Sequence, residues 1–366
     1  MEIRVLHVID HLGYGGAPVV VKNVTEKLDT EHIEILVCAL RTNPEAMPIK
    51  STLISLTHNK YNPFAFITIA KLCKQHKIDI IHAHLQKSII SSLLAGFFCD
   101  AKIIIHEHGP IFRRGTGCIY RFLLKLLANK ASAAIANSQA AMTALQQTTG
   151  FTEQSARVVA NFVDFALFDL SLYDRQKTRD TLGIAQDKKV VGFLGRLDSC
   201  KGADLLIKAA AILCRKDPQY HFIIAGHGAQ KNQLEQLVLQ LGLKENITFT
   251  GLCKNPAEVI SAFDIAVIPS RREAFGIAAI EFMRMKIPVI ASPVGGLVEV
   301  VQHNKTGILL DNLSADNIAL AVSSLMQDNS LRETLAENAE LFSRKFDGSE
   351  QLKQIMEIYN QLRLKI

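Results

Sequence analysis

The stretch IAVIPSRREAFGIAAIEF, residues 265–282, contains one complete strand–loop–helix unit. Ile265–Ile268 is a short apolar run, typical of a strand buried on both faces. The loop that follows carries Glu273, and Gly276 opens a segment with helical spacing of its apolar residues. Repeated strand–helix units build a parallel sheet covered by helices on both faces, so this stretch decides the fold class as α/β.

The same unit recurs along the chain in two series. In the first, apolar runs predict strands at Ile3–Ile9, Ile78–His82, Lys102–Ile105 and Ala131–Ala136, with helices at Pro18–Leu28, Pro63–His76 and Ser138–Gln147. In the second, the predicted strands are Lys189–Leu194, His221–Ala225, Ile247–Thr250, Ile265–Ile268, Pro288–Ala291 and Gly307–Leu310.

The two series are separated by residues 161–187, which are aromatic and charged and show no strand pattern. We therefore expect two doubly wound domains, residues 1–167 and 168–348. The tail from Asp316 is helical with an interruption at Gly348. In open parallel sheets, ligands bind beyond the carboxyl ends of the strands. Two such domains facing each other would form a cleft, so the loops after the strands are the ones to search for function.

Composition excludes several classes of protein. The chain has 366 residues, 48% hydrophobic and 21% charged, which excludes a disordered chain. Its most apolar stretch, Ser88–Cys99, is too short to span a bilayer. The N-terminus runs directly into a strand pattern, so we expect no signal peptide. The seven cysteines are scattered, which favours a reducing, cytoplasmic location over a disulfide or metal framework.

The positive charge is concentrated in the first half of the chain. Residues 1–180 contain 20 Lys and Arg against 15 Asp and Glu, and the remainder contains 21 against 20. Nine of the twelve histidines also lie in the first half. We therefore expect the first domain to meet a more anionic partner than the second.

The first strand of the second series ends in GRLDSCKG, residues 195–202. Arg196 and Lys201 lie on the predicted loop, and Gly202 precedes a helix. Two cations in this position suit a diphosphate, although a pair of solvated surface cations is the alternative. In GHG after the next strand, Gly226 and Gly228 allow a ligand to approach the backbone closely.

Residues 273–281 combine an E-x(7)-E spacing with a glycine at the start of a helix. The N–H groups of Phe275, Gly276 and Ile277 can point at phosphate oxygens, because a helix N-terminus presents unpaired donors. A carboxylate at Glu273 would then lie beside that phosphate and is suited to hydroxyls rather than to charge. Glu281 lies about two turns into an apolar helix, where a carboxylate is costly to bury without hydrogen-bond donors such as ribose hydroxyls. The alternatives are an exposed loop carboxylate and a solvent-facing helix residue.

The first half offers a glycine turn and two pairs of histidines. The sequence DHLGYGGAP places Gly13, Gly15 and Gly16 before a helix, and Pro18 excludes a dinucleotide fingerprint there. The pairs His82 with His84 and His106 with His108 lie at predicted strand ends. They can bind a sugar or phosphate, or they can be structural. A zinc site is less favoured, because no H-E-x-x-H motif or cysteine pair accompanies them.

The segment PIFRRGTGCIYRFLLKLLANK, residues 110–130, contains cations and no acidic residue. Its apolar residues from Cys118 to Leu127 have helical spacing, which predicts a basic amphipathic helix. Such a helix suits an anionic membrane surface, or it packs on the core with a solvated cationic face. No aromatic platform or recognised motif supports nucleic-acid binding. The cations are Arg113, Arg114, Arg121, Lys125 and Lys130.

Together these motifs resemble the family 4 retaining glycosyltransferases, which have the GT-B architecture. The resemblance spans nearly the whole chain and is most specific in the second half. The residues that carry it are GGA (15–17), GRLDSCKG (195–202), GHG (226–228), EAFG (273–276), SPVGGLVEVV (292–301) and NKTGILL (304–310). The sequence departs from the family pattern at Pro18 and in NFVD, residues 161–164. The resemblance also implies that the last helix, residues 349–366, crosses back to the first domain.

The resemblance implies a role for each matching residue. Arg196 and Lys201 match the cations that hold the donor diphosphate, and the backbone of residues 275–277 matches the stretch at its distal phosphate. Glu273 matches the carboxylate on the transferred sugar, and Glu281 the one on the ribose. Other matches are Gly16 and Gly228 near the phosphates, and His108, with His106 as second choice, at the donor sugar.

The resemblance thus implies a metal-independent enzyme with no cofactor, in which a nucleotide-sugar, most commonly a UDP-sugar, is a substrate. The acceptor would be a glycan or a lipid-linked molecule in envelope polysaccharide or lipopolysaccharide synthesis, at the inner face of a membrane. Two alternatives stay open. One is an epimerase or phosphorylase of the same architecture, and the other is a non-catalytic subunit that binds nucleotide-sugar.

Overall fold

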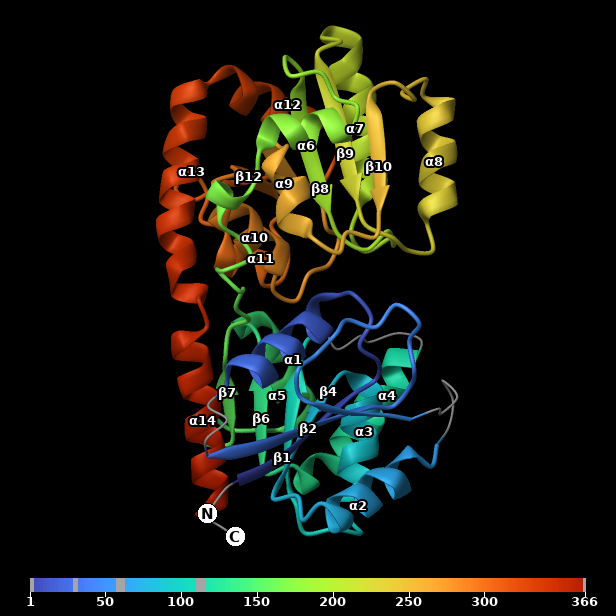
Figure 1. Ribbon diagram of the computed structural model, residues 1–366, viewed down its shortest axis with the longest axis vertical. Coiled ribbons are helices and arrows are strands. Elements are labelled where there is room, and N and C mark those ends of the chain that lie inside the picture. The colour runs from blue at the N-terminus through green and yellow to red at the C-terminus, as the bar shows by residue number, and fades with distance from the viewer. Residues whose placement is uncertain (1–2, 29–31, 57–62, 110–115, 365–366) are drawn as a thin grey trace. The chain divides into compact units, whose positions relative to one another are not determined.

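The computed structural model describes residues 3–28, 32–56, 63–109 and 116–364 (Figure 1). The chain divides into two compact units. The first contains Met1–Phe162 and Gly348–Ile366, and the second contains Val163–Asp347. The C-terminal helix thus belongs to the unit that the N-terminal half of the chain forms.

The first unit is built on a parallel sheet with the strand order β3-β2-β1-β4-β5-β6-β7. Its described strands are β1 (Ile3–Ile9), β2 (Ile33–Ala39), β3 (Thr52–Ser55), β4 (Ile80–His84), β5 (Lys102–Glu107), β6 (Ala133–Ala136) and β7 (Ala156–Val158). Its described helices are α1 (Gly16–Lys27), α2 (Ala65–Gln75), α3 (Gln86–Ala95), α4 (Thr116–Leu127), η1 (Ala128–Lys130), α5 (Gln139–Thr149) and α14 (Ser349–Arg363).

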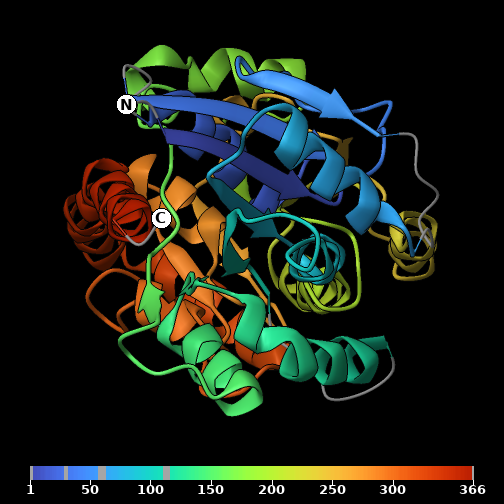
Figure 2. The same cartoon turned by 90° about the horizontal axis from the view of Figure 1, so that it is seen from below.

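Side chains alternate between the two faces of this sheet. Leu6 and Val8 of β1 face a core cluster that includes apolar residues of α2, α3, α4 and α5. His7 and Ile9 have the opposite parity and therefore lie on the other face. There, Ile9 packs with Val21 of α1, and Tyr359 of α14 contacts His7 and His82. Figure 2 shows α14 and α3 on opposite sides of the strands.

The second unit is built on a parallel sheet with the strand order β10-β9-β8-β11-β12-β13. Its described strands are β8 (Lys189–Leu194), β9 (Tyr220–Ala225), β10 (Ile247–Gly251), β11 (Ile265–Ile268), β12 (Val289–Ala291) and β13 (Ile308–Leu309). Its described helices are η2 (Leu170–Leu172), α6 (Arg175–Thr181), α7 (Ala203–Lys216), α8 (Lys231–Gln240), α9 (Pro256–Ser261), α10 (Ile277–Arg284), α11 (Leu297–Val300), α12 (Ala315–Gln327), α13 (Asn329–Ser343) and η3 (Arg344–Phe346).

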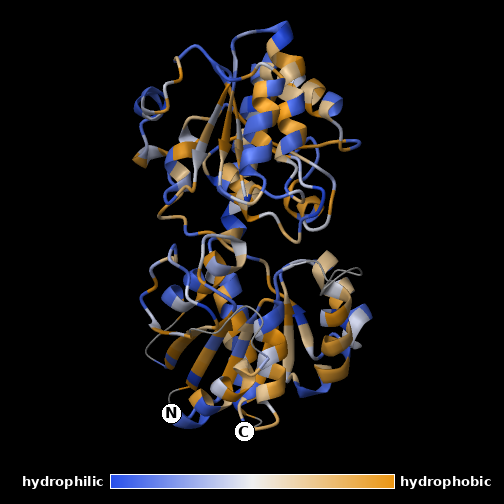
Figure 3. Ribbon diagram, turned by 90° about the vertical axis from the view of Figure 1, so that its right-hand side faces the viewer, coloured by the Kyte–Doolittle hydropathy of each residue, from blue (hydrophilic) through white to orange (hydrophobic). Residues whose placement is uncertain are grey.

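One hydrophobic core cluster of the second unit lies between its sheet and helices α7, α8, α12 and α13. Val191, Phe222 and Val267 from three neighbouring strands are buried in it. Figure 3 shows hydrophobic colouring along the strands and alternating colouring along the helices, as expected for buried parallel strands and amphipathic helices.

The predicted α/β class and the two doubly wound parallel sheets are confirmed. Ile3–Ile9, Lys189–Leu194 and Ile265–Ile268 form strands with the predicted bounds, and the described break contains no strand but does contain helix α6. The prediction for β4 was wrong by two residues, because the strand runs from Ile80 to His84. Strands β2, β3 and β7 were not predicted.

Candidate functional site

The loops that were predicted to carry chemistry in the second unit extend from strands β8 and β11. These two strands are neighbours at the point where the strand order reverses, since β8 connects to β9 on one side and β11 continues on the other. The carboxyl ends of strands at such a reversal are the usual ligand site of an open α/β sheet. The loop after β8 carries Arg196 and Lys201, and the loop after β11 carries Glu273.

Lys201 and Glu273 form an ion pair at this edge. Lys201 Nζ lies 2.6 Å from Glu273 Oε2, and Ser270 Oγ donates to the same oxygen at 3.1 Å. The side chains of Lys201 and Glu273 are only 24% and 13% exposed. The sequence predicted separate roles for these two residues, and the structure brings them into direct contact. The two loops together therefore offer a cation and a carboxylate side by side, suited to a phosphate next to a hydroxyl.

Arg196 lies on the same loop but is more exposed. Its Nη2 lies 2.9 Å from Asp198 Oδ2, and its side chain is 62% exposed. Arg196 is therefore an exposed cation at the rim of the loop, whereas Lys201 is held in place by its ion pair with Glu273.

Arg271 is a cation of this edge that the sequence analysis missed. Its Nη1 and Nη2 donate to Asp204 Oδ1 and Oδ2 at 2.8 and 2.7 Å, and Nη1 also donates to the carbonyl of Ser199. The hydrogen bond from Arg271 holds the pKa of Asp204 below its usual value. This bidentate contact fastens the loop after β11 to the first turn of α7. The two arginines directly before Glu273 in the sequence were the signal from which a cation at this position could have been predicted.

Three successive backbone N–H groups are unpaired at the start of α10. Among the described residues, the N–H groups of Phe275, Gly276 and Ile277 have no hydrogen-bond acceptor. Gly276 caps the helix with φ +99°, a conformation that favours glycine. These are the donors that were predicted to face a phosphate, and their free state fits an anion site at a helix N-terminus.

The backbone of Glu273 is fixed by a glycine of the loop after β12. A Cβ atom at Gly295 would lie 1.8 Å from the carbonyl oxygen of Glu273, and Gly295 has φ +53°. The two backbones therefore touch in a way that no larger residue permits. At the loop after β9, a Cβ at Gly228 would lie 2.4 Å from the carbonyl oxygen of Leu197, so this glycine is required by the packing of the chain's own backbone. The predicted approach of a ligand to Gly228 stays a prediction.

Glu281 is buried on α10, with 8% of its surface exposed. It is the fifth residue of this helix, so it lies just over one turn from the start and not two. Within the described part of the chain, its carboxylate has no hydrogen-bond or ion-pair partner. Burial raises its pKa from 4.5 to about 7. The solvent-facing alternative for this residue is therefore wrong, and a buried carboxylate is left without donors.

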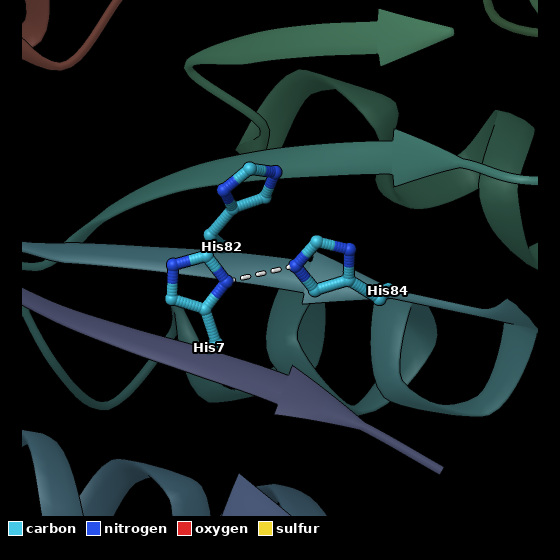
Figure 4. Close-up of side chains that lie close together, drawn as sticks. All are labelled: His7, His82 and His84. Atoms are coloured by element: carbon cyan, nitrogen blue, oxygen red, sulfur yellow. Dashed lines mark hydrogen bonds between the residues drawn. The ribbon is translucent and has the colours of Figure 1, made fainter. Parts of the chain in front are cut away.

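In the first unit, the two predicted histidine pairs belong to one cluster. His7, His82, His84 and His106 project from β1, β4 and β5 on one face of the sheet, and His108 follows on the same face. Figure 4 shows His7, His82 and His84, with His7 Nδ1 and His84 Nε2 joined at 3.0 Å. His7 was not predicted as a member of this cluster, although its place in the alternation of β1 was a signal.

All five histidines are neutral because they are buried. Burial lowers the pKa of His7 and His108 to about 3 and holds the pKa values of His82, His84 and His106 well below the usual value. Ring nitrogens of His84, His106 and His108 lie within 4.8 Å of one another, as do those of His7, His82 and His84. Neutral imidazoles at this spacing are able to ligate a transition metal.

Gly16 is the first residue of α1, which begins two residues earlier than predicted, so Gly16 lies in the helix and not in the turn before it. The predicted basic helix is α4, and its exposed side carries a stripe of apolar residues. Ile119, Phe122 and Leu126 are 63%, 67% and 63% exposed, while Tyr120 and Leu124 are buried. The other predicted cations Arg113 and Arg114 lie outside the described residues. Among the described helices, none combines the length and the apolar character that crossing a bilayer requires.

Two family models match the chain. The model described as Glycosyltransferase Family 4 matches residues 14–167, and the model described as Glycosyl transferases group 1 matches residues 174–342. The first covers most of the N-terminal half, and the second covers all the loops of the site in the second unit.

Named relatives and a solved structure agree with these models. The chain is 35% identical over 192 residues to an uncharacterized glycosyltransferase of Methanocaldococcus jannaschii (51% of this chain, 49% of the relative). It is 34% identical over 193 residues to an alpha-D-kanosaminyltransferase of Streptomyces kanamyceticus (52% and 50%). The chain thus spans about half the length of the curated relatives it matches.

A crystal structure of HepE from Anabaena in complex with UDP superimposes on this fold. The TM-score is 0.81 at 25% identity, and the match covers 99% of this chain and 100% of HepE. The match extends over both parallel sheets. The chain therefore belongs to the family 4 glycosyltransferases of GT-B architecture.

Proposed function

We propose that this enzyme transfers a hexose from a UDP-hexose to a glycan or lipid-linked acceptor with retention of the anomeric configuration. The observation that carries the proposal is the edge of the second sheet. There the Lys201–Glu273 pair and the unpaired N–H groups at the start of α10 lie on neighbouring loops, and the buried Glu281 follows one turn later. A nucleoside diphosphate-sugar needs this combination of anion donors and carboxylates.

The diphosphate is the leaving group, and its negative charge grows as the glycosidic bond breaks. Lys201, Arg196 and the N–H groups of Phe275, Gly276 and Ile277 meet that charge without a divalent ion. One preorganised donor of this kind contributes about 3–4 kcal/mol to lowering the barrier. The UDP complex of HepE supports uridine as the nucleoside of the donor.

The carboxylates take the hydroxyls of the donor. Glu281 accepts hydrogen bonds from the ribose and Glu273 from the transferred sugar, as the family resemblance implies. The resemblance assigns His108 to the donor sugar, with His106 as the alternative. Because burial keeps His108 neutral, its ring orients a hydroxyl and does not repel the positive character that develops on the sugar.

The reaction is a substitution at the anomeric carbon. The bond from this carbon to the phosphate oxygen breaks, and a bond to the acceptor oxygen forms on the same face. The proton of the acceptor hydroxyl passes to the departing phosphate oxygen. No dedicated protein base is needed in this scheme.

Calorimetry with UDP-glucose, with and without magnesium, tests the donor site. We expect binding in the presence of a chelator, and in a transfer reaction we expect NMR to show a product with the anomeric configuration of the donor. Binding that requires magnesium or manganese, an inverted product, or no binding of any nucleotide-sugar would contradict the proposal. Conversion of UDP-glucose without an acceptor would instead indicate an epimerase or phosphorylase.

For the acceptor, we propose a lipid-linked molecule at an anionic membrane surface. The support comes from α4, where Ile119, Phe122 and Leu126 form an exposed apolar stripe and Lys125 lies beside it. Apolar side chains flanked by cations suit the boundary between lipid headgroups and acyl chains. The charge excess of the first half agrees with this partner.

Flotation with phosphatidylglycerol vesicles tests the membrane proposal. We expect the protein to float at low salt and Phe122→Ser to weaken flotation strongly. Leu320→Ser is the matched control, since Leu320 on α12 of the other unit is also 67% exposed. Absence of flotation at low salt, or equal losses for both variants, would refute the role of α4.

A further inference from the structure

The buried histidines and Tyr359 form a continuous chain of hydrogen bonds. From one end, His108 Nε2 lies 2.8 Å from His84 Nδ1, and His84 Nε2 lies 3.0 Å from His7 Nδ1. The Tyr359 hydroxyl is the central link, at 3.3 Å from His7 Nε2 and 2.7 Å from His82 Nδ1. His82 Nε2 then lies 3.2 Å from His106 Nδ1.

The chain couples the protonation of all its members. A neutral imidazole has one N–H donor and one bare acceptor nitrogen, and the tyrosine hydroxyl donates one bond and accepts another. Every ring uses its Nδ1 toward one end of the chain and its Nε2 toward the other. A chain in which every link has one proton therefore requires all five rings to carry the proton on the same type of nitrogen, either Nε2 or Nδ1.

The two ends of the chain are the atoms without partners. His106 Nε2 and His108 Nδ1 are buried and have no hydrogen-bond partner among the described residues. Their rings are stacked with centroids 4.0 Å apart. Because the chain has one direction, one of these atoms is a donor whenever the other is an acceptor. A hydroxyl group also donates once and accepts once, so it has the one donor and the one acceptor that the two ends need.

We propose that Tyr359 and the five histidines act as one tautomeric chain whose ends, His106 and His108, bind a single hydroxyl group. The hydroxyl belongs to a carbohydrate or to a water molecule. Tyr359, His7, His82 and His84 are then positioning residues, because they decide which end donates. The carbohydrate source rests on the proposed function, whereas the chain itself does not.

A metal ion at the ends fits this chain poorly. If His106 Nε2 and His108 Nδ1 bind a metal, the proton of each ring lies on its other nitrogen, which is Nδ1 of His106 and Nε2 of His108. Both halves of the chain then donate toward Tyr359, whose oxygen must accept twice while its own proton has no acceptor in the chain. A metal between His7, His82 and His84 would displace hydrogen bonds that already exist. The geometry favours a hydroxyl over a metal.

Nitrogen NMR of the full chain labelled with 15N-histidine tests the proposal. Two-bond proton–nitrogen spectra show which ring nitrogen carries hydrogen, and single histidine substitutions assign the signals. We expect all five rings in the free protein at neutral pH to be uncharged and to share one tautomer. A mixture of tautomers among the five rings, or a charged ring, would overturn the proposal. This measurement uses the unmodified protein, so it does not depend on the folding of a variant.

Tyr359→Phe removes the central link and keeps the ring. We expect a second tautomer to appear on one side of residue 359, because the two halves are then independent. Unchanged tautomers in all five rings would overturn the coupling. Tyr173→Phe is the control, since it removes an exposed hydroxyl that donates to the carbonyl of Leu167 at 2.9 Å.

Three additions identify what occupies the ends. A change at His106 and His108 with UDP-glucose but not with UDP assigns the hydroxyl to the sugar, and no change with either assigns it to water. Stoichiometric binding of zinc chloride with loss of the bare-nitrogen signals of these rings would replace the proposal with a metal site. If no nucleotide-sugar binds in calorimetry, the proposed function fails while the tautomer result stands on its own.

Discussion

The buried carboxyl of Glu281 leads to the sharpest stability prediction. We expect Glu281→Gln to stabilise the second unit at alkaline pH, because the side chain is 8% exposed and its carboxylate has no partner among the described residues. Ionisation in such a place is costly, since the charge loses its hydration and gains no hydrogen bonds. The amide keeps the shape of the side chain and cannot ionise.

The magnitude follows from the shift in pKa. Burial raises the pKa of Glu281 from 4.5 to about 7. At about 1.4 kcal/mol per pH unit, this shift corresponds to roughly 3 kcal/mol. For a carboxyl whose pKa is raised by folding, the stabilising contribution is complete below pH 4.5 and is lost as the pH rises to about 7. The advantage of the glutamine variant should therefore be small at about pH 5 and near its full value at about pH 8.

Urea unfolding at these two pH values measures the difference. The control is Glu235→Gln on α8 of the same unit, where the carboxylate is 44% exposed and pairs with Lys231 at 3.7 Å. We expect the control to change stability by less than about 0.5 kcal/mol at either pH. A difference between Glu281→Gln and the parent that does not grow with pH would refute the reasoning.

The same residue links donor binding to protons. If ribose hydroxyls donate to the Glu281 carboxylate, UDP favours its ionised form and lowers its pKa. Binding near pH 6.5 should then release a fraction of a proton, which calorimetry detects as a dependence of the heat on the ionisation enthalpy of the buffer. Glu281→Gln should bind UDP more weakly and without that dependence. Proton uptake on binding would contradict the ribose assignment.

Three further substitutions test the second unit. Lys201→Ala should lower kcat about 10²–10³-fold, because it removes one preorganised donor. Lys189→Ala is the control, since it removes an equally short 2.6 Å ion pair at the opposite end of β8 and should leave kcat unchanged. Equal effects of the two substitutions on kcat in a transfer assay would count against the site. Gly295→Ala should weaken UDP binding and lower the melting temperature, because the added Cβ overlaps the carbonyl oxygen of Glu273. If the UDP affinity measured by calorimetry is unchanged, the loop adapts to the added methyl group and the reasoning fails. Arg179→Met should lower the free energy of unfolding, measured with urea, by about 3–5 kcal/mol. The reason is that Arg179 is 2% exposed and its guanidinium donates to three backbone carbonyls and a carboxylate. A decrease of less than about 1 kcal/mol would be inconsistent with that network.

Most of the strands that the sequence predicted have strong, continuous apolar character, although β2 also has it and was missed. Lys189–Leu194 and Ile265–Ile268 lie at the centre of their sheet and are bounded by loops, so their bounds could be predicted. Thr52–Ser55 and Ala156–Val158 are short strands at the two edges of the first sheet with partly exposed side chains. Their pairing depends on the neighbouring strand more than on their own residues, so local pattern missed them.

The types of residue at the donor edge were predictable, and their contacts were not. Glycines, cations and carboxylates after buried strands mark a ligand site in any open parallel sheet. The contact between Lys201 and Glu273 joins residues 72 positions apart, and the contact between Arg271 and Asp204 joins residues 67 apart. Only the strand order and register bring such pairs together, and neither can be read from local spacing.

The two sheets place their polar groups in different ways, and this difference separates the kinds of chemistry open to them. In the second unit, Lys201 and Glu273 lie on loops beyond the strands, where the side chain of Lys201 is 24% exposed and can reach an anion. In the first unit, His7 and its neighbours lie within the strands, where burial suppresses their charge. Neutral rings cannot hold a diphosphate by charge. They can transmit a proton position over a series of hydrogen bonds, and Tyr359 completes that series because the chain returns to its first unit in α14. The C-terminal helix therefore does more than cover a sheet face, because among the described residues its Tyr359 hydroxyl links the row His108, His84 and His7 to the row His82 and His106.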